Sequence, residues 1–204
     1  MLPALTAVNR LPGPGERAIL PAMRNILRSF TITATLLTVA TPLAAQTPQG
    51  VMGDLLRDVT QVEQKVVGLA KAIPATGYEW RPGKGARSTG EVFMHIASDN
   101  YFMPVILGTA APVDTGITKE YSTAEAFEKR TMSRDAIIAE LEKSFAFLKA
   151  AMTAAPEATL NTPMGTQKQS PRALWIATAT HLHEHLGQLI AYARSNSVVP
   201  PWSR

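Results

Sequence analysis

Four stretches of the chain, each about 20 residues long, carry apolar side chains at intervals of three and four. The stretches are residues 52–73, 88–104, 133–152 and 171–195. This spacing places the apolar side chains on one face of an α-helix, and no stretch shows the strict alternation typical of a β-strand. The sequence therefore predicts an all-α chain, folded as a four-helix bundle with long connections.

Short polar signals mark where three of these helices begin. Ser88 and Glu91 have the spacing of a capping box, in which each side chain accepts a hydrogen bond from the other residue's backbone N–H. Ser133 stands in the capping position of the third helix. Pro171 follows Ser170 at the first helical position, where the N–H that proline lacks would have no partner within the helix.

The connections between the helices show no periodicity. Residues 105–121 and 156–169 are rich in Gly, Pro and Thr, so they are predicted to be long loops. A short helical piece is expected at 123–130, a brief extended pair near Thr166, and an extended tail at 198–204.

Residues 1–45 contain the layout of a secretory signal peptide. Two arginines precede an apolar run, and small residues follow up to Ala45, where cleavage is expected. Translation is expected to start at Met23, because residues 1–22 have no role in this layout. The apolar run is too short and too rich in threonine for a good membrane span, although an N-terminal anchor that is kept is the alternative. On either interpretation, residues 46–204 form the working domain, in the periplasm or outside the cell.

Charge and cysteine content exclude two kinds of function. The net charge is +4, but residues 1–45 hold four of the 20 basic residues and only one of the 16 acidic residues. The remaining 16 basic and 15 acidic residues leave 46–204 nearly neutral, so there is no electrostatic case for nucleic-acid binding. The chain has no cysteine, which excludes disulfides and a thiolate nucleophile.

Three of the four histidines lie close together, at His181, His183 and His185. On a helix that turns about 100° per residue, His181 and His185 project from one face, whereas His183 points away. Two imidazoles one turn apart make half of a metal site, and a third ligand must come from elsewhere. His95 is the only other histidine, and an antiparallel or crossed pairing of its helix with the last helix can bring it level with the pair. We therefore expect His95, His181 and His185 to form a metal site.

The polar residues near these histidines leave several roles open. Glu184 could act as a general base, as a hydrogen-bond partner of a ligand imidazole, or only as a surface carboxylate. Asp99, one turn after the histidine of its helix, could supply an oxygen ligand or hold a bound water. Gln188, in the turn after the pair, could donate to a ligand or hold its helix against a neighbour. Glu184 and Asp99 are the candidate catalytic residues, and His183 is expected to be exposed or to contact a ligand.

Two other interpretations of the histidine motif are disfavoured. A solvated histidine-rich face is disfavoured because Leu182, Leu186 and Leu189 make this helix largely buried, where unpaired histidines are costly. The letters HLHEH match the H-x-x-E-H signature of inverted zinc proteases, which need a carboxylate ligand further along the chain. The 19 residues after His185 include no Asp or Glu.

Three segments carry a resemblance to a known family: WRPGKGARSTGEVFMHIASDN at 80–100, HLHEHLGQLIAYAR at 181–194, and VPPWS at 199–203. Together they resemble the DinB-like, YfiT-related four-helix family. The resemblance implies that the three predicted histidines bind a divalent ion such as zinc or nickel, with water in the open positions, in a protein that pairs as a homodimer. Characterised members of that family include S-transferases that use small thiols.

Two functions are consistent with this pattern. The first is a metal-dependent enzyme, a hydrolase or a small-thiol S-transferase, that acts on a small-molecule substrate. A neutral three-histidine set leaves the charge of the ion intact, and such a zinc lowers the pKa of bound water to about 7. The alternative is a non-catalytic periplasmic protein that binds a metal or another ligand.

Overall fold

The computed structural model describes residues 49–166 and 168–203. The described α-helices are α1 (Gly50–Ala72), α2 (Thr89–Ile106), α3 (Tyr121–Glu128), α4 (Arg134–Ala154) and α5 (Pro171–Ser195). No β-strand occurs in this part of the chain, and a single bridge between Met164 and Gln169 lies where the brief extended pair was expected. The all-α prediction is confirmed. None of the described helices has the length and the apolar character that a membrane span requires, and the predicted signal peptide lies outside the described residues.

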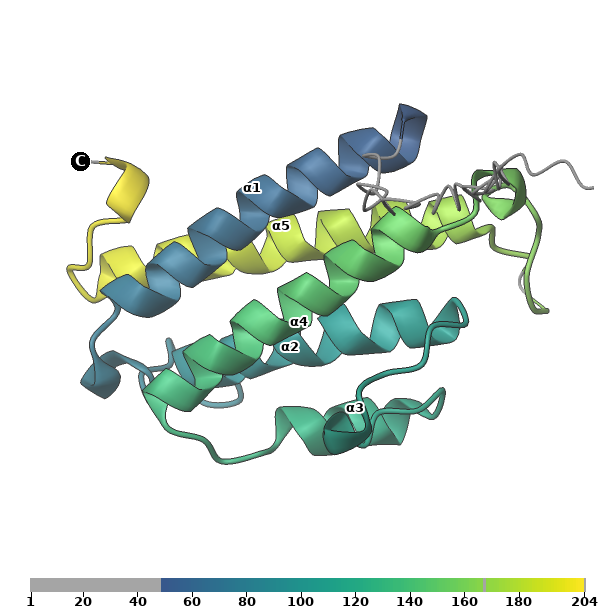
Figure 1. Cartoon of the computed structure of the whole chain (residues 1–204). Coiled ribbons are helices and arrows are strands. Elements are labelled where there is room, and N and C mark those ends of the chain that lie inside the picture. Colours follow the sequence, from purple (N-terminus) through teal and green to yellow (C-terminus); the bar gives the residue numbers. More distant parts are fainter. Residues whose placement is uncertain (1–48, 167, 204) are drawn as a thin grey trace, which may run out of the picture. The chain divides into compact units, whose positions relative to one another are not determined.

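The four long helices form a bundle in which α4 and α5 each pack against both α1 and α2. Figure 1 shows α1 and α5 running in one direction and α2 and α4 in the other. Because α2 and α4 are parallel, the chain must return along the bundle between them. The return segment contains α3, which packs on α2. The four-helix bundle is therefore confirmed, with a short additional helix on its side.

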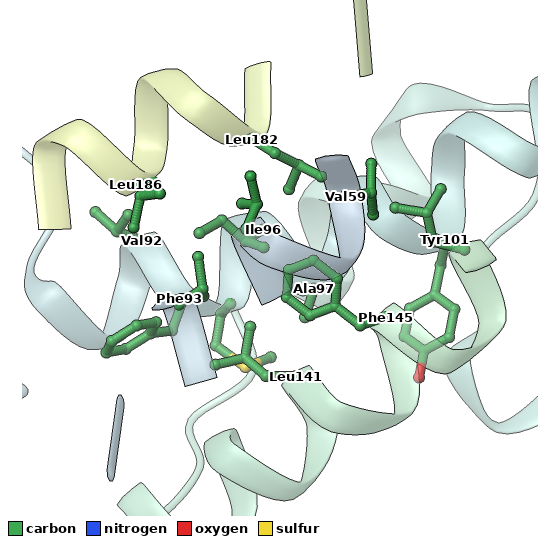
Figure 2. Close-up of a cluster of buried hydrophobic side chains, with 14 of the residues drawn as sticks. Val59, Val92, Phe93, Ile96, Ala97, Tyr101, Leu141, Phe145, Leu182 and Leu186 are labelled. Atoms are coloured by element: carbon green, nitrogen blue, oxygen red, sulfur yellow. The ribbon is translucent and has the colours of Figure 1, made fainter. Parts of the chain in front are cut away.

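Helix α2 lies at the centre of the packing. Of its 18 residues 14 are buried, and α3, α4 and α5 all contact it. Figure 2 shows Phe93 and Ile96 of α2 in one cluster with Phe145 of α4 and Leu182 of α5. A helix that is apolar on every side is stable only when it is covered on every side.

The predicted capping residues occupy the predicted positions. Ser88 Oγ accepts from the Glu91 N–H at 3.3 Å, and Glu91 Oε2 accepts from the Ser88 N–H at 2.7 Å. Ser133 and Ser170 each accept from the backbone N–H three residues further on. The helix starts therefore follow from contacts within one turn, as the sequence indicates.

The connections differ from the prediction in three details. Helix α3 begins at Tyr121, two residues before the predicted 123–130. The loop that was predicted at 105–121 contains a 3₁₀ turn at Val113–Thr115. The tail is not extended throughout, because Pro201–Ser203 forms a 3₁₀ turn that packs on α1. This turn depends on a contact with a distant helix, which the sequence around it does not show.

The substitution Ser88→Ala should lower the free energy of unfolding by about 1 kcal/mol, because it removes the side chain that caps α2. Urea unfolding followed by circular dichroism measures the change. Ser122→Ala, at an exposed serine inside α3, is the control and should change the free energy by less than about 0.5 kcal/mol. Equal stability of Ser88→Ala and the wild type would show that the cap does not stabilise the bundle.

Candidate metal centre

Helices α2 and α5 bring three histidines together. The ring centroids of His95 and His185 are 4.6 Å apart, those of His95 and His181 5.2 Å, and those of His181 and His185 4.4 Å. One nitrogen of each ring lies within 4.8 Å of the others. His95 is buried, and the other two rings are partly buried. The antiparallel packing of α2 and α5 thus places side by side the three histidines that the sequence singles out.

The outer nitrogen of His95 is held by a carboxylate. His95 Nδ1 lies 2.9 Å from Glu128 Oε2, and Arg87 Nε donates to Glu128 Oε1 at 2.6 Å. An ionised carboxylate only accepts, so His95 Nδ1 carries a proton, and Nε2 is the ring nitrogen that is left for a metal ion. Glu128 is the last residue of α3, so the return segment of the bundle orients this imidazole.

The outer nitrogen of His185 is held by an amide. His185 Nδ1 donates to Gln188 Oε1 at 2.9 Å, because Gln188 Nε2 is itself the donor to the Tyr192 hydroxyl at 2.9 Å. The Tyr192 hydroxyl donates in turn to the Arg87 carbonyl at 3.3 Å. Gln188 therefore accepts from the histidine instead of donating to it, and the Tyr192 hydroxyl that it contacts links α5 to the segment before α2.

Asp99 lies between the rings of His181 and His95. Its Oδ2 is 3.2 Å from His181 Nδ1 and 3.5 Å from His95 Nε2. A proton on His181 Nδ1 faces this carboxylate, which favours the tautomer that leaves Nε2 with a lone pair. Burial raises the pKa of Asp99, and the nearby His95 opposes this rise only in part. The position is compatible with both roles expected for Asp99, an oxygen ligand or a partner of a bound water.

The inner nitrogens of the histidine pair face each other. When the proton of each ring is on Nδ1, the tautomer that leaves the inner nitrogens free for an ion, His181 Nε2 and His185 Nε2 present two lone pairs at a distance of 2.9 Å. No hydrogen bond can form between two lone pairs, whereas a shared cation would be attracted by both. Neutral imidazole nitrogens in such a set suit zinc and related divalent ions. The residues present therefore fit a divalent metal ion.

Protonation states in the centre also suit a metal ion. Burial, followed by repulsion from the His185 and His95 rings when these are protonated, lowers the pKa of His181 to about 4. Burial likewise lowers the pKa of His185. Burial would raise the pKa of Glu128, but hydrogen bonds from His95 and Arg87 outweigh it and lower that pKa to about 2. At neutral pH the pair is therefore neutral, as metal binding requires of its ligands, and Glu128 is charged.

The two remaining residues of the motif, His183 and Glu184, are not bonded to the three clustered imidazoles in the described structure. His183 Nε2 is 2.9 Å from Asp58 Oδ2 of α1, and its side chain is half exposed, as expected for a histidine on the other face. Glu184 is exposed, and within the described residues no hydrogen bond joins it to the three clustered imidazoles. The role of Glu184 as a hydrogen-bond partner of an imidazole is therefore not seen.

An open hollow of about 450 Å³ adjoins the centre. His95 and His181 form part of its wall, so a small molecule in the hollow can reach the centre. Two carboxylates, two threonines and several apolar or aromatic side chains complete the lining: Asp99, Glu184, Phe102, Met103, Tyr121, Ala177, Thr178 and Thr180. This volume is in the range of small-ligand sites.

Sequence reasoning missed the residues that hold the rings from outside. Glu128 is separated from His95 by 33 positions, and no local pattern relates them. The helical signal at 123–130 predicts that Glu128 lies on a helix, but not that this helix covers α2. Arg87 directly precedes the capping serine, and that position carries no sign of its contact with Glu128.

The fold and the site together define a class: an all-α bundle with three imidazoles clustered between two antiparallel helices. Residues 58–189, which include all three histidines, match the family model of the DinB superfamily, and the chain belongs to this superfamily. The crystal structure of a DinB-like protein, YjoA, from Bacillus subtilis is similar, with a TM-score of 0.57 and 17% identity over 74% of this chain and 98% of that chain. At this identity the likeness concerns the fold. None of the curated proteins matches the chain.

In the metal-free protein, His181 should titrate near pH 4, below the ordinary value of 6.5. Between these values the unfolded chain binds more protons than the folded one, so the contribution of His181 to stability is complete above about pH 6.5 and is lost as the pH falls toward 4. NMR of the imidazole C–H groups measures the pKa. The variant His181→Gln should lose stability less steeply over this window, and a pKa of 6.5 or higher would contradict the prediction.

Proposed function

We propose that the protein is a metal-dependent enzyme in which His95, His181 and His185 hold a divalent ion, zinc or nickel. The observation that supports it is the pair of facing ring nitrogens, His181 Nε2 and His185 Nε2, which are 2.9 Å apart in a partly buried site with His95 beside them. An ion bound there supplies Lewis acidity to a water or a thiol. The reaction is accordingly a hydrolysis or the transfer of a small thiol to a substrate.

The surrounding residues have distinct tasks in this proposal. Glu128 and Gln188 hold the rings of His95 and His185 in their orientation. Asp99 lines the hollow, and its raised pKa suits a group that accepts a proton at Oδ2 and returns it. Glu184 lies on the exposed side of the hollow, where it can pass a proton to solvent.

One observation favours the second candidate, a non-catalytic protein that binds a metal or another ligand. Asp99 Oδ2 lies 3.5 Å from His95 Nε2, near enough to complete a set of four protein ligands, which is typical of structural sites. The periplasmic or secreted location and the homodimer remain predictions from the sequence and from the family resemblance.

The protein should carry about one divalent ion per chain after purification, measured by elemental analysis, and His95→Ala should lose it. His183→Ala is the matched control, because His183 belongs to the same motif but pairs with Asp58. It should keep the metal. Wild-type protein without stoichiometric metal, or His95→Ala protein with unchanged metal content and melting temperature, would refute the metal site.

The substitution Asp99→Asn separates the two candidates. We expect the variant to keep its metal and to lose about a hundredfold or more in kcat, because a proton acceptor has been removed. The assays are hydrolysis of nitrophenyl esters and transfer of a small thiol to chlorodinitrobenzene. Asp58→Asn, at a carboxylate away from the hollow, is the control and should keep the wild-type kcat. Loss of metal from Asp99→Asn, together with an inactive wild type, would favour the non-catalytic protein.

A further inference from the structure

The hollow beside the metal centre has an aromatic wall. Tyr121 of α3 and Phe102 of α2 meet with ring centroids 5.6 Å apart and an angle of 66° between the rings. Tyr121 is 54% exposed, whereas Phe102 is buried at 8%. Tyr121 is therefore a large aromatic side chain that a molecule in the hollow can reach, and Phe102 supports it.

The hollow also carries negative charge. Asp99 and Glu184 are in its lining, and among the residues that the structure describes neither a lysine nor an arginine lines it. Burial, and then the charges of Asp99 and of the two glutamates of α3, raises the pKa of the Tyr121 hydroxyl. Arg87 opposes this rise, but its Nε is bound to Glu128 at 2.6 Å. The electrostatic potential at Tyr121 is thus made negative mainly by carboxylates.

The two lining carboxylates are placed differently. Asp99 contacts the imidazoles of His181 and His95, so a metal ion in the centre would neutralise much of its charge. Glu184 is exposed and has no such contact in the described part of the chain. The charge of Glu184 therefore remains available to a molecule that enters the hollow.

We propose that the substrate of this site carries a small alkylammonium group, which the Tyr121 ring and the Glu184 carboxylate bind together. The face of an aromatic ring attracts a cation, and a carboxylate beside it adds a charge of opposite sign. An uncharged group of the same shape keeps the apolar contact and loses both attractions, and an anion is repelled. This inference rests on the proposed function, because it takes the hollow to be the substrate site.

Three probes of nearly equal shape test the proposal: choline, its uncharged isostere dimethylbutanol, and the anion dimethylbutanoate. Binding is measured with the purified protein by NMR titration of the labelled methyl group of Met103, which lines the hollow. The titrations are run on chelator-treated protein and on zinc-loaded protein. We expect choline to bind about tenfold more tightly than dimethylbutanol in both forms, and dimethylbutanoate to bind most weakly in the metal-free form.

Two substitutions locate the cause of the preference. Glu184→Gln and Tyr121→Leu should each reduce the ratio of choline to dimethylbutanol affinity several-fold. Glu157→Gln, at an exposed carboxylate in the turn Glu157–Thr159 and outside the hollow, is the control and should leave the ratio unchanged. Glu184 is exposed, so its substitution should not affect folding. Equal binding of choline and dimethylbutanol, or a preference that survives both substitutions, would overturn the proposal.

The metal-free titration separates this inference from the proposed function. A choline preference in the chelator-treated form of a protein that carries no stoichiometric metal as purified would support the cation site and refute the metal-dependent enzyme. A metal-loaded, active protein without the preference would refute the cation site alone.

Discussion

Helix α2 must be covered on nearly every side, because 14 of its 18 residues are buried and its apolar side chains are not confined to one face. Helices α4 and α5 cover two sides, and α3 covers a further one. Since α2 and α4 are parallel, the chain has to return along the bundle before α4 begins (Figure 1). The segment that makes this return is thus also the one that completes the burial of α2.

The same packing builds the candidate metal centre. A buried imidazole is costly unless its polar atoms have partners, and α3 provides one by placing Glu128 against His95. Tyr121, at the other end of α3, forms part of the wall of the hollow. One short helix therefore covers α2, orients a proposed ligand and shapes the space next to it, so the scaffold and the site cannot be varied independently.

Membership of the DinB superfamily defines the fold, but a fold shared by proteins of different activities does not define a reaction. The chemistry proposed for this chain depends on its own side chains. The facing nitrogens of His181 and His185 support a metal ion, and the carboxyl group of Asp99 supports proton transfer. The exposed Glu184 and the ring of Tyr121 support a cationic substrate.

The sequence by itself determined the features that depend on neighbours within about one turn. These features include the shared face of His181 and His185, and the helix starts at Ser88, Ser133 and Ser170. The count of histidines then indicated His95 as the third ligand. The contact of Glu128 with His95 and the pairing of His183 with Asp58 join residues 33 and 125 positions apart. Only the tertiary structure decided these contacts, because they depend on the helix directions and on the side of α2 that α3 covers, and apolar spacing encodes neither.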